Sequence, residues 1–241
     1  QYSLFFVSGV EFGNDLKKAY NFLKSHKVEG ILFCHHIPIW KEFNLDTQNP
    51  DIPIVSINMA AQEMTSVVVD NTTGGYQAAE HLYGCGMRHP AMICGPEDRL
   101  SVQDRLKGFS QRVKELNLQM PTHCYYGNYD FSHGFDAAEQ LMKDYPQTDG
   151  IFCANDYIAA GAISALQKMN IHIPNQVRVV GFDNRDFSEF WNTPITTFEL
   201  PLQEMGMLGV SLLKQVIHTG NYSKTQHVLQ SKLIPRKSSK G

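Results

Sequence analysis

The sequence predicts an α/β protein built on parallel sheets, and three observations support this fold class. Short apolar runs of strand length alternate with segments of helical periodicity along the whole chain. Most of these runs are apolar at successive positions, as expected of parallel strands that helices cover on both faces. The composition, 42% hydrophobic and 19% charged over 241 residues, is that of a globular chain and excludes a disordered or repetitive one.

The expected elements follow one another in a regular order. Residues 14–25 are expected to form a helix because Leu16, Ala19 and Leu23 fall on one helical face. Glycine or proline follows most of the other helical segments and marks their ends. The expected strands are 4–7, 30–34, 54–57, 66–69, 91–94, 123–126, 150–154, 177–182 and 227–234. The expected helices are 14–25, 74–83, 102–116, 132–143, 156–169 and 204–217.

Charge and cysteine content narrow the function classes. The chain has 21 Lys and Arg against 24 Asp and Glu, a net charge of −3, and lacks the basic excess of a stand-alone nucleic-acid binder. Its one basic cluster, residues 236–240, is expected to be a solvated terminus. Five cysteines with no pair in CxxC spacing predict buried free thiols in a reducing cytosol rather than a disulfide scaffold.

Motifs for catalysis and for cofactor binding are missing from the sequence. It contains no GxxxxGK[ST] loop, no GxGxxG after a strand, no GxSxG elbow and no HExxH pair. His35 and His36 are adjacent, but without further ligands in metal spacing they are expected to be an ordinary loop pair. Paired catalysis by Asp70 and Asp183 is an alternative that no activated nucleophile supports. We therefore expect no enzymatic activity, no cofactor and no metal.

Polar or turn-forming pairs come directly after four of the predicted strands. In parallel α/β sheets, ligands bind outside the carboxyl ends of the strands, so these pairs predict a polar crevice. The pairs are Asp70-Asn71, Gly95-Pro96, Asn155-Asp156 and Asp183-Asn184.

Side chains near these strand ends suit a sugar. Asp183, Asn155 and Arg105 each offer two-pronged hydrogen bonding that matches vicinal hydroxyl groups. Aromatic rings cover the apolar face of a pyranose, and the candidates for this role are Tyr129, Phe131 and Tyr157. Alternatives stay open at this point: Arg105 could pair with Asp104 or Glu97, Phe131 could be core, and Asn155 could be only a helix cap.

Six longer motifs stand in a fixed order along the chain. They are 69–82 (VDNTTGGYQAAEHL), 95–96 (GP) with 105–109 (RLKGF), 152–156 (FCAND), 173–184 (IPNQVRVVGFDN), 194–197 (PITT) with 204–206 (EMG), and 233–239 (LIPRKSS). Together they resemble the effector-binding region of the LacI/GalR family of bacterial transcriptional regulators. The resemblance covers essentially all 241 residues, and it depends on the succession of motifs rather than on any one of them.

The resemblance implies a periplasmic-binding-protein-like fold of type I. Two doubly wound parallel-sheet subdomains would be joined by three crossovers around a sugar-sized cleft. The expected N-terminal subdomain is 1–88 plus 202–228, and the expected C-terminal subdomain is 89–201 plus 229–241.

The resemblance also implies a function. The chain would be the effector-binding and dimerisation domain of a cytoplasmic, homodimeric regulator, in which a sugar or related metabolite alters the affinity for operator DNA. Positions that match the family's ligand contacts are Arg105, Asn155, Asp183, Tyr129, Phe131, Ser101 and Thr73.

One departure from the family pattern leaves a second function open. The chain begins at a segment similar to the family's second strand, so the DNA-reading module and the first strand and helix are expected to lie in a longer protein. The alternative is an exported sugar-binding protein of a transport system. The unpaired cysteines argue against that alternative.

Overall fold

The computed structural model describes residues 2–12, 15–34, 52–58, 64–221 and 225–240. The chain forms two compact units, residues 1–68 with 202–229 and residues 69–201 with 230–241. It therefore passes between the units three times, as the expected crossovers require. Residues His35 and His36 lie outside the described residues.

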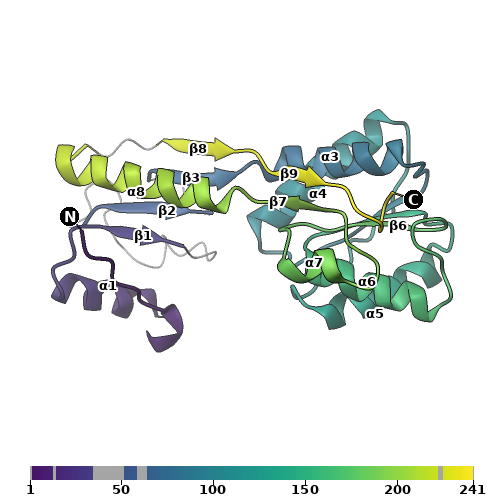
Figure 1. Ribbon diagram of the computed structural model, residues 1–241, viewed down its shortest axis with the longest axis horizontal. Helices are drawn as coiled ribbons and strands as arrows, with labels where there is room; N and C mark the ends of the chain where they lie inside the picture. The colour runs from purple at the N-terminus through teal and green to yellow at the C-terminus, as the bar shows by residue number, and fades with distance from the viewer. Residues whose placement is uncertain (1, 13–14, 35–51, 59–63, 222–224, 241) are drawn as a thin grey trace. The chain divides into compact units, whose positions relative to one another are not determined.

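The first unit contains a sheet in the order β1-β2-β3-β8, in which β1 pairs with β2 and β2 with β3 in parallel. Helix α8 packs along β1 and β2 (Figure 1). Its close approach depends on Gly209, where a Cβ would press on Ile57. The elements are η1 (Gly9–Phe12), α1 (Leu16–Ser25), β1 (Ile31–Phe33), β2 (Ile54–Ile57), β3 (Ser66–Val69), α8 (Leu202–Thr219) and β8 (Gln226–Leu229).

The second unit is a doubly wound α/β layer structure. Its parallel sheet β4-β5-β6 has α3 and α4 on one face and α5 and α6 on the other (Figure 1). Strands β4 and β5 are buried along their full length, which explains their unbroken apolar runs. The elements are α3 (Asn71–Gly84), β4 (Pro90–Ile93), α4 (Leu100–Glu115), α5 (Phe131–Asp144), β5 (Gly150–Cys153), α6 (Asp156–Lys168), β6 (Arg178–Val180), α7 (Asp186–Phe190), β7 (Thr197–Glu199) and β9 (Lys232–Ile234).

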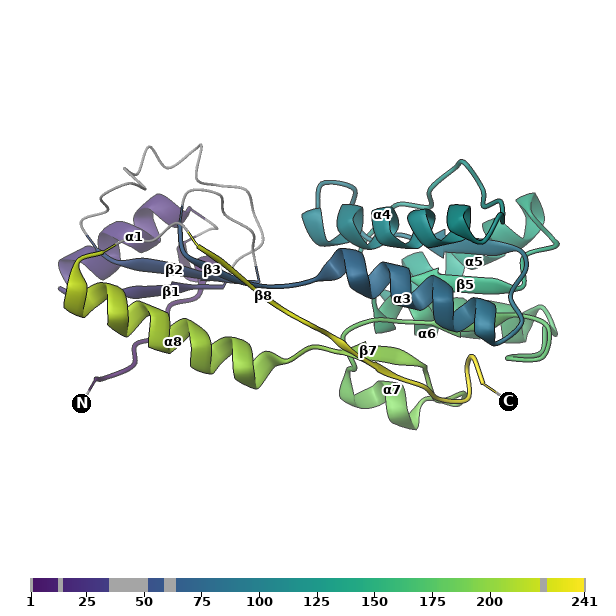
Figure 2. The same cartoon turned by 90° about the horizontal axis from the view of Figure 1, so that it is seen from above.

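Glycines allow the two helix pairs of this unit to pack backbone against backbone. A Cβ on Gly75 would overlap the carbonyl oxygen of Arg105, and one on Gly108 would overlap that of Thr72. Gly134 and Gly161 play the same part between α5 and α6. The contact between α3 and α4, visible from above in Figure 2, fixes the position of Arg105 along α4 relative to the start of α3.

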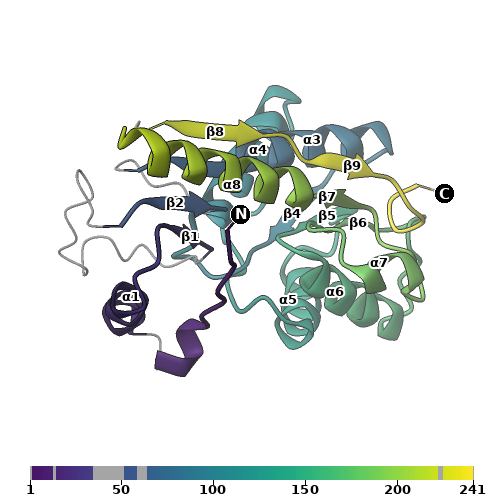
Figure 3. The same cartoon turned by 60° about the vertical axis from the view of Figure 1, so that its left-hand side comes forward.

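The C-terminal segment is only partly solvated, which corrects the expectation of a solvated basic terminus: Lys237 and Lys240 are exposed, but the two serines between them are buried. The Ser238 carbonyl accepts the Val179 N–H at 2.8 Å, and its hydroxyl donates to the Val179 carbonyl and accepts the Thr196 N–H. Ser238 and Ser239 are 0% and 1% exposed. The segment lies beside β6 and β7 (Figure 3), so its polar side chains satisfy backbone groups at the edge of the sheet.

The structure confirms most predicted elements and corrects three. Residues 4–7 form no strand, because they have no partner strand among the described residues, and Leu4 and Phe6 are 74% and 86% exposed. The predicted strand 123–126 is reduced to one bridge between Tyr125 and Ile93. The predicted strand 227–234 is two strands, β8 and β9, that belong to different sheets. Helix α7 and strand β7 were not predicted.

The division of the chain also differs from the expected boundary at residue 88. The chain enters the second unit at Val69, since α3 packs against α4 and its start is tied to residues of that unit. The chain returns to the first unit at residue 202 and leaves it again between residues 229 and 230. Among the described residues, no helix has the length and apolarity that a membrane span requires.

Candidate functional site

Arg105 is the centre of a polar cluster in the second unit. It lies on α4, is 6% exposed, and stacks its guanidinium 3.6 Å from the centroid of the Phe182 ring. Its Nε donates to Asn71 Oδ1 at 2.9 Å, and its Nη1 donates to the carbonyl of Ala154. Asn71 follows β3, Ala154 follows β5 and Phe182 follows β6, so one side chain joins three strand ends.

Asp183 faces Arg105 across a short gap. Its Oδ1 lies 3.6 Å from Arg105 Nη2, longer than the about 2.7–2.9 Å of a charge-assisted hydrogen bond. Among the described residues no hydrogen-bond donor reaches either oxygen of this carboxylate. Arg105 Nη2 likewise has no hydrogen-bond acceptor within that part of the chain. The pair therefore compensates charge while both groups keep hydrogen-bonding capacity.

Burial dominates the electrostatics of this pair. Desolvation lowers the pKa of the Arg105 guanidinium, and the neighbouring Asp183 carboxylate partly opposes that shift. Desolvation also raises the pKa of Asp183, against the attraction of Arg105 and Arg185. A buried pair of opposite charge with no net charge favours a neutral polar ligand over an ionic one.

Asn155 caps helix α6 and still has a free donor. Its Oδ1 accepts the Ile158 N–H at 2.8 Å, so Asn155 is the N-cap of α6. Its Nδ2 has no acceptor within the described part of the chain, and the residue is 5% exposed. The Asp156 N–H donates to the Phe182 carbonyl at 2.9 Å, so the turn at Asn155 runs alongside the segment that carries Asp183.

Ser101, on the same helix as Arg105, and Tyr129, in the segment before α5, form a second polar group. Their hydroxyl oxygens are 3.4 Å apart, and Ser101 lies one helical turn before Arg105. The Tyr129 ring covers Gly95, where a Cβ would collide with it. Burial raises the pKa of the Tyr129 hydroxyl, which therefore stays a neutral donor and acceptor.

Thr73 is engaged in capping α3. Its hydroxyl donates to Asp70 Oδ2 at 2.6 Å, and its N–H donates to Asp70 Oδ1 at 2.8 Å. Gln230 Nε2 donates to the same carboxylate at 3.1 Å. The hydroxyl of Thr73 can therefore serve a ligand only as an acceptor unless this cap opens.

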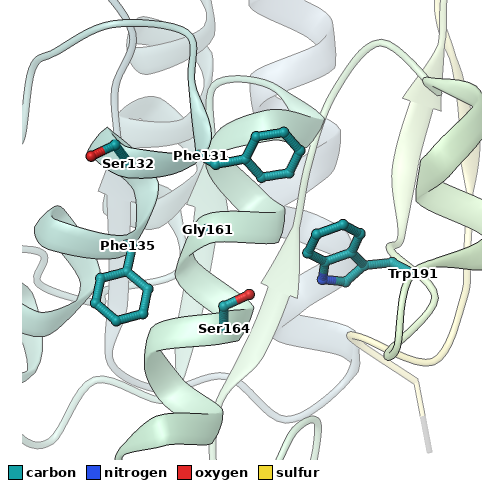
Figure 4. Close-up of a pocket in the computed structure, with 6 residues that line it drawn as sticks. All are labelled: Phe131, Ser132, Phe135, Gly161, Ser164 and Trp191. Atoms are coloured by element: carbon teal, nitrogen blue, oxygen red, sulfur yellow. The ribbon is translucent and has the colours of Figure 1, made fainter.

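Phe131 lies in an aromatic cluster at the start of α5. It stacks on Trp191 with ring centroids 5.5 Å apart and also contacts Tyr157 and Phe187. The cluster borders an open apolar groove with a volume of about 460 Å³ (Figure 4). The residues that line the groove are Phe131, Ser132, Phe135, Gly161, Ser164 and Trp191.

Two members of the polar cluster were not named as contacts by sequence reasoning. Asn71 and Phe182 orient Arg105, one by accepting its Nε–H and the other by stacking beneath it. Both stand beside predicted strand ends, so the rule that led to Asp70-Asn71 and Asp183-Asn184 contained the signal. No group of three metal-binding side chains occurs within the described residues.

Comparisons with known proteins agree on the type of domain. Residues 79–239 match the model of the periplasmic binding protein-like domain. The chain is 28% identical over 246 residues to the HTH-type transcriptional repressor PurR of Haemophilus influenzae (strain PittEE), covering 99% of this chain and 73% of that protein.

Solved structures give the same result. A complex of the transcriptional regulator CelR with cellobiose has a TM-score of 0.83 at 26% identity, covering 96% of this chain and 71% of that one. A periplasmic binding protein/LacI transcriptional regulator from Alkaliphilus metalliredigens QYMF, complexed with D-xylulofuranose, has a TM-score of 0.81 at 28% identity. That match covers 100% of this chain and 88% of the other.

Proposed function

Because the chain belongs to the periplasmic binding protein-like domain family, in its LacI/GalR branch of transcriptional regulators, we propose that the Arg105 cluster is its effector site. The observation that carries the proposal is the unused hydrogen-bonding capacity of Asp183, Arg105 and Asn155. Buried polar groups are normally satisfied, so acceptors and donors left open beside one another favour a polar ligand between them.

The proposed effector is a neutral sugar. Asp183 accepts hydrogen bonds, whereas Arg105 Nη2 and Asn155 Nδ2 donate them, and a pair of vicinal hydroxyl groups supplies both kinds of partner. An anionic ligand at Arg105 would meet the Asp183 carboxylate, which lies 3.6 Å from Arg105 Nη2. Two structural relatives are complexed with cellobiose and with D-xylulofuranose, which supports the same class of ligand.

A melting panel tests the ligand class. Neutral sugars such as cellobiose, D-xylulose and D-glucose are each added at millimolar concentration, with glucose 6-phosphate as the anionic arm and a 2,3-di-O-methyl sugar as the matched control. We expect at least one neutral sugar to raise the Tm, and its O-methylated form to lose that effect, because ligands that bind only the folded state stabilise it. A response to the phosphosugar alone would refute a neutral effector.

The apolar groove is proposed as a dimerisation surface. It exposes aromatic side chains on one side of the second unit: Phe131 is 39% exposed and the neighbouring Phe190 is 83% exposed. Exposed apolar clusters of this kind mark interaction sites, and the LacI/GalR resemblance implies a second copy of the chain as the partner. Phe131, one of the residues proposed for ligand contact, would then serve the interface rather than the sugar.

Sedimentation velocity tests the dimer surface. Ser164→Arg places a long cation in the groove without changing the core, since Ser164 is half-buried on the surface of α6. Lys114→Glu on the exposed side of α4 is the control. We expect the wild type and the control to sediment as dimers and Ser164→Arg as a monomer with unchanged helix content. A dimeric Ser164→Arg variant would exclude this surface.

The remaining proposals concern the whole regulator. We infer a non-catalytic sensor in the cytoplasm that controls operator binding, because the named relative is a transcriptional repressor and all five cysteines are free thiols. The chain spans 73% of that relative, so operator contacts are proposed for residues outside these 241. Sequencing about 100 codons upstream of Gln1 separates a regulator, with a helix-turn-helix there, from an exported binding protein, with a signal peptide.

A further inference from the structure

The Asp183 carboxylate is carried by an unusual backbone turn. Asp183 and Asn184 have φ angles of +99° and +49°, two consecutive non-glycine residues in a region that L-amino acids rarely adopt. Asp and Asn tolerate this region better than other side chains, but each such residue still costs free energy. A turn of this kind persists only where the surrounding structure holds it, so its supporting contacts decide where the Asp183 side chain points. Several contacts hold this turn: the Asp183 N–H donates to the Phe198 carbonyl, and Arg236 Nη2 donates to Asn184 Oδ1.

Asp156, at the start of α6, supports the two N–H groups that follow Asp183. Its Oδ2 accepts the Arg185 N–H at 2.7 Å, and its Oδ1 accepts the Thr197 hydroxyl at 2.6 Å. The Thr197 oxygen in turn accepts the Asn184 N–H at 3.2 Å. Both backbone N–H groups that follow Asp183 are therefore held, directly or through one hydroxyl, by a single carboxylate.

A glycine leaves room for the buried Asp156 carboxylate. Asp156 is 0% exposed, and Gly181 lies directly against it: a Cβ at position 181 would collide with Asp156 Oδ1. Burial raises the pKa of Asp156 to about 7, although both hydrogen bonds lower it. The charged and titratable groups near it are Asp183, Arg236, Arg105 and Cys153, and Arg185 contacts it through a backbone N–H.

We propose that Asp156 is a positioning residue of the effector site: its buried carboxylate holds the 183–185 turn in the left-handed conformation that aims Asp183 at Arg105. The inference rests on the proposed function only in giving Asp183 a ligand to bind. The hydrogen-bonding roles of the two aspartates differ, since Asp156 has an N–H or O–H donor on each oxygen and Asp183 has none among the described residues. Asp156 thus organises the site without touching the ligand.

Hydrogen–deuterium exchange of the full chain without ligand tests the inference. Asp156→Asn keeps the shape but cannot accept both bonds without turning an N–H donor toward one of them. Thr197→Val removes the hydroxyl relay, and Thr197→Ser restores it as the matched control. We expect the amides of Asn184 and Arg185 to exchange at least about tenfold faster in Asp156→Asn, and that of Asn184 in Thr197→Val. Thr197→Ser and the distant α3 peptide, residues 71–84, should exchange at wild-type rates.

The outcomes separate this inference from the proposed function. Unchanged exchange of both amides in Asp156→Asn would overturn the positioning role, whatever ligand the protein binds. If Asp156→Asn does not fold, Thr197→Val against Thr197→Ser decides, because a purely packing role of Thr197 would leave Asn184 protected in the isosteric valine variant. A protein that fails every sugar panel but shows the expected exchange pattern would refute the sugar and leave the turn assignment standing.

Discussion

Replacing Asp156 with asparagine should change how the stability of the second unit depends on pH. The folded protein raises the pKa of this carboxyl from 3.8 to about 7 because the group is buried. Between these two values the folded state holds a proton that the unfolded state has lost, so stability falls as the pH rises. The favourable contribution is fully present below pH about 4 and is gone above pH about 7. Asparagine does not titrate and lacks this dependence.

The size of the effect follows from the two pKa values. Each pH unit inside the window changes the free energy of unfolding by about 1.4 kcal/mol per proton. From pH 5 to pH 7 the wild type should lose about 2 kcal/mol relative to Asp156→Asn, less than two full units because the folded group is half titrated at the upper end. Beyond pH 8 the difference in the free energy of unfolding between the two proteins should stay constant. Groups that titrate equally in both proteins do not contribute to this difference.

Urea unfolding at pH 5, 6, 7 and 8 measures this difference. A Trp40→Phe background leaves Trp191 as the one tryptophan, and it packs against Phe131 and Phe187 in the second unit. Its fluorescence therefore reports on the unit that contains Asp156. Urea midpoints of wild type and Asp156→Asn that run parallel across the pH range would refute this prediction, since Asp156 would then titrate alike in the folded and unfolded states.

Three further changes test the packing around the site. Gly108→Ala should destabilise the second unit by about 3 kcal/mol in urea, because its Cβ meets the Thr72 carbonyl; wild-type stability would contradict the close helix contact. Asp130→Ala should cost about 1 kcal/mol by removing the cap on the His133 N–H, with Asp130→Asn as a near-neutral control. Ser238→Ala should lower the free energy of unfolding by about 2 kcal/mol in thermal unfolding, since it leaves the Thr196 N–H buried and unpaired. A loss below about 0.5 kcal/mol would mean that the terminus detaches.

The fold and the centre of the site could be predicted because both follow local rules. Apolar strand runs and helical periodicity depend on neighbouring residues, and the structure bears them out in β4, β5 and α4. The strand-end rule pointed to Asp183, and the hydrogen-bonding chemistry and the family resemblance added Arg105; the structure brings the two side chains to 3.6 Å. Their contact with a ligand stays a prediction.

The remaining features depend on contacts between residues far apart in the sequence. The polar tail at Ser238 looks solvated until its hydrogen bonds with Val179 and Thr196 are known. The segment 227–234 is expected from the sequence to form one strand, but its two halves pair with strands of different units. Phe131 is an aromatic residue of the kind that stacks on sugars, so the sequence predicts a ligand contact. In the structure its ring stacks on Trp191, and both residues line the apolar groove.

The most direct test of the central claim is an isothermal titration of the strongest neutral sugar from the melting panel. It compares wild type, Asp183→Asn, which tolerates a positive φ, and Asp186→Asn, an exposed carboxylate three residues away as the control. We predict that Asp183→Asn weakens binding by about 30-fold or more, as expected for losing hydrogen bonds to a charged group, and that Asp186→Asn does not. Equal affinity in all three proteins would show that the sugar binds elsewhere and would contradict the account.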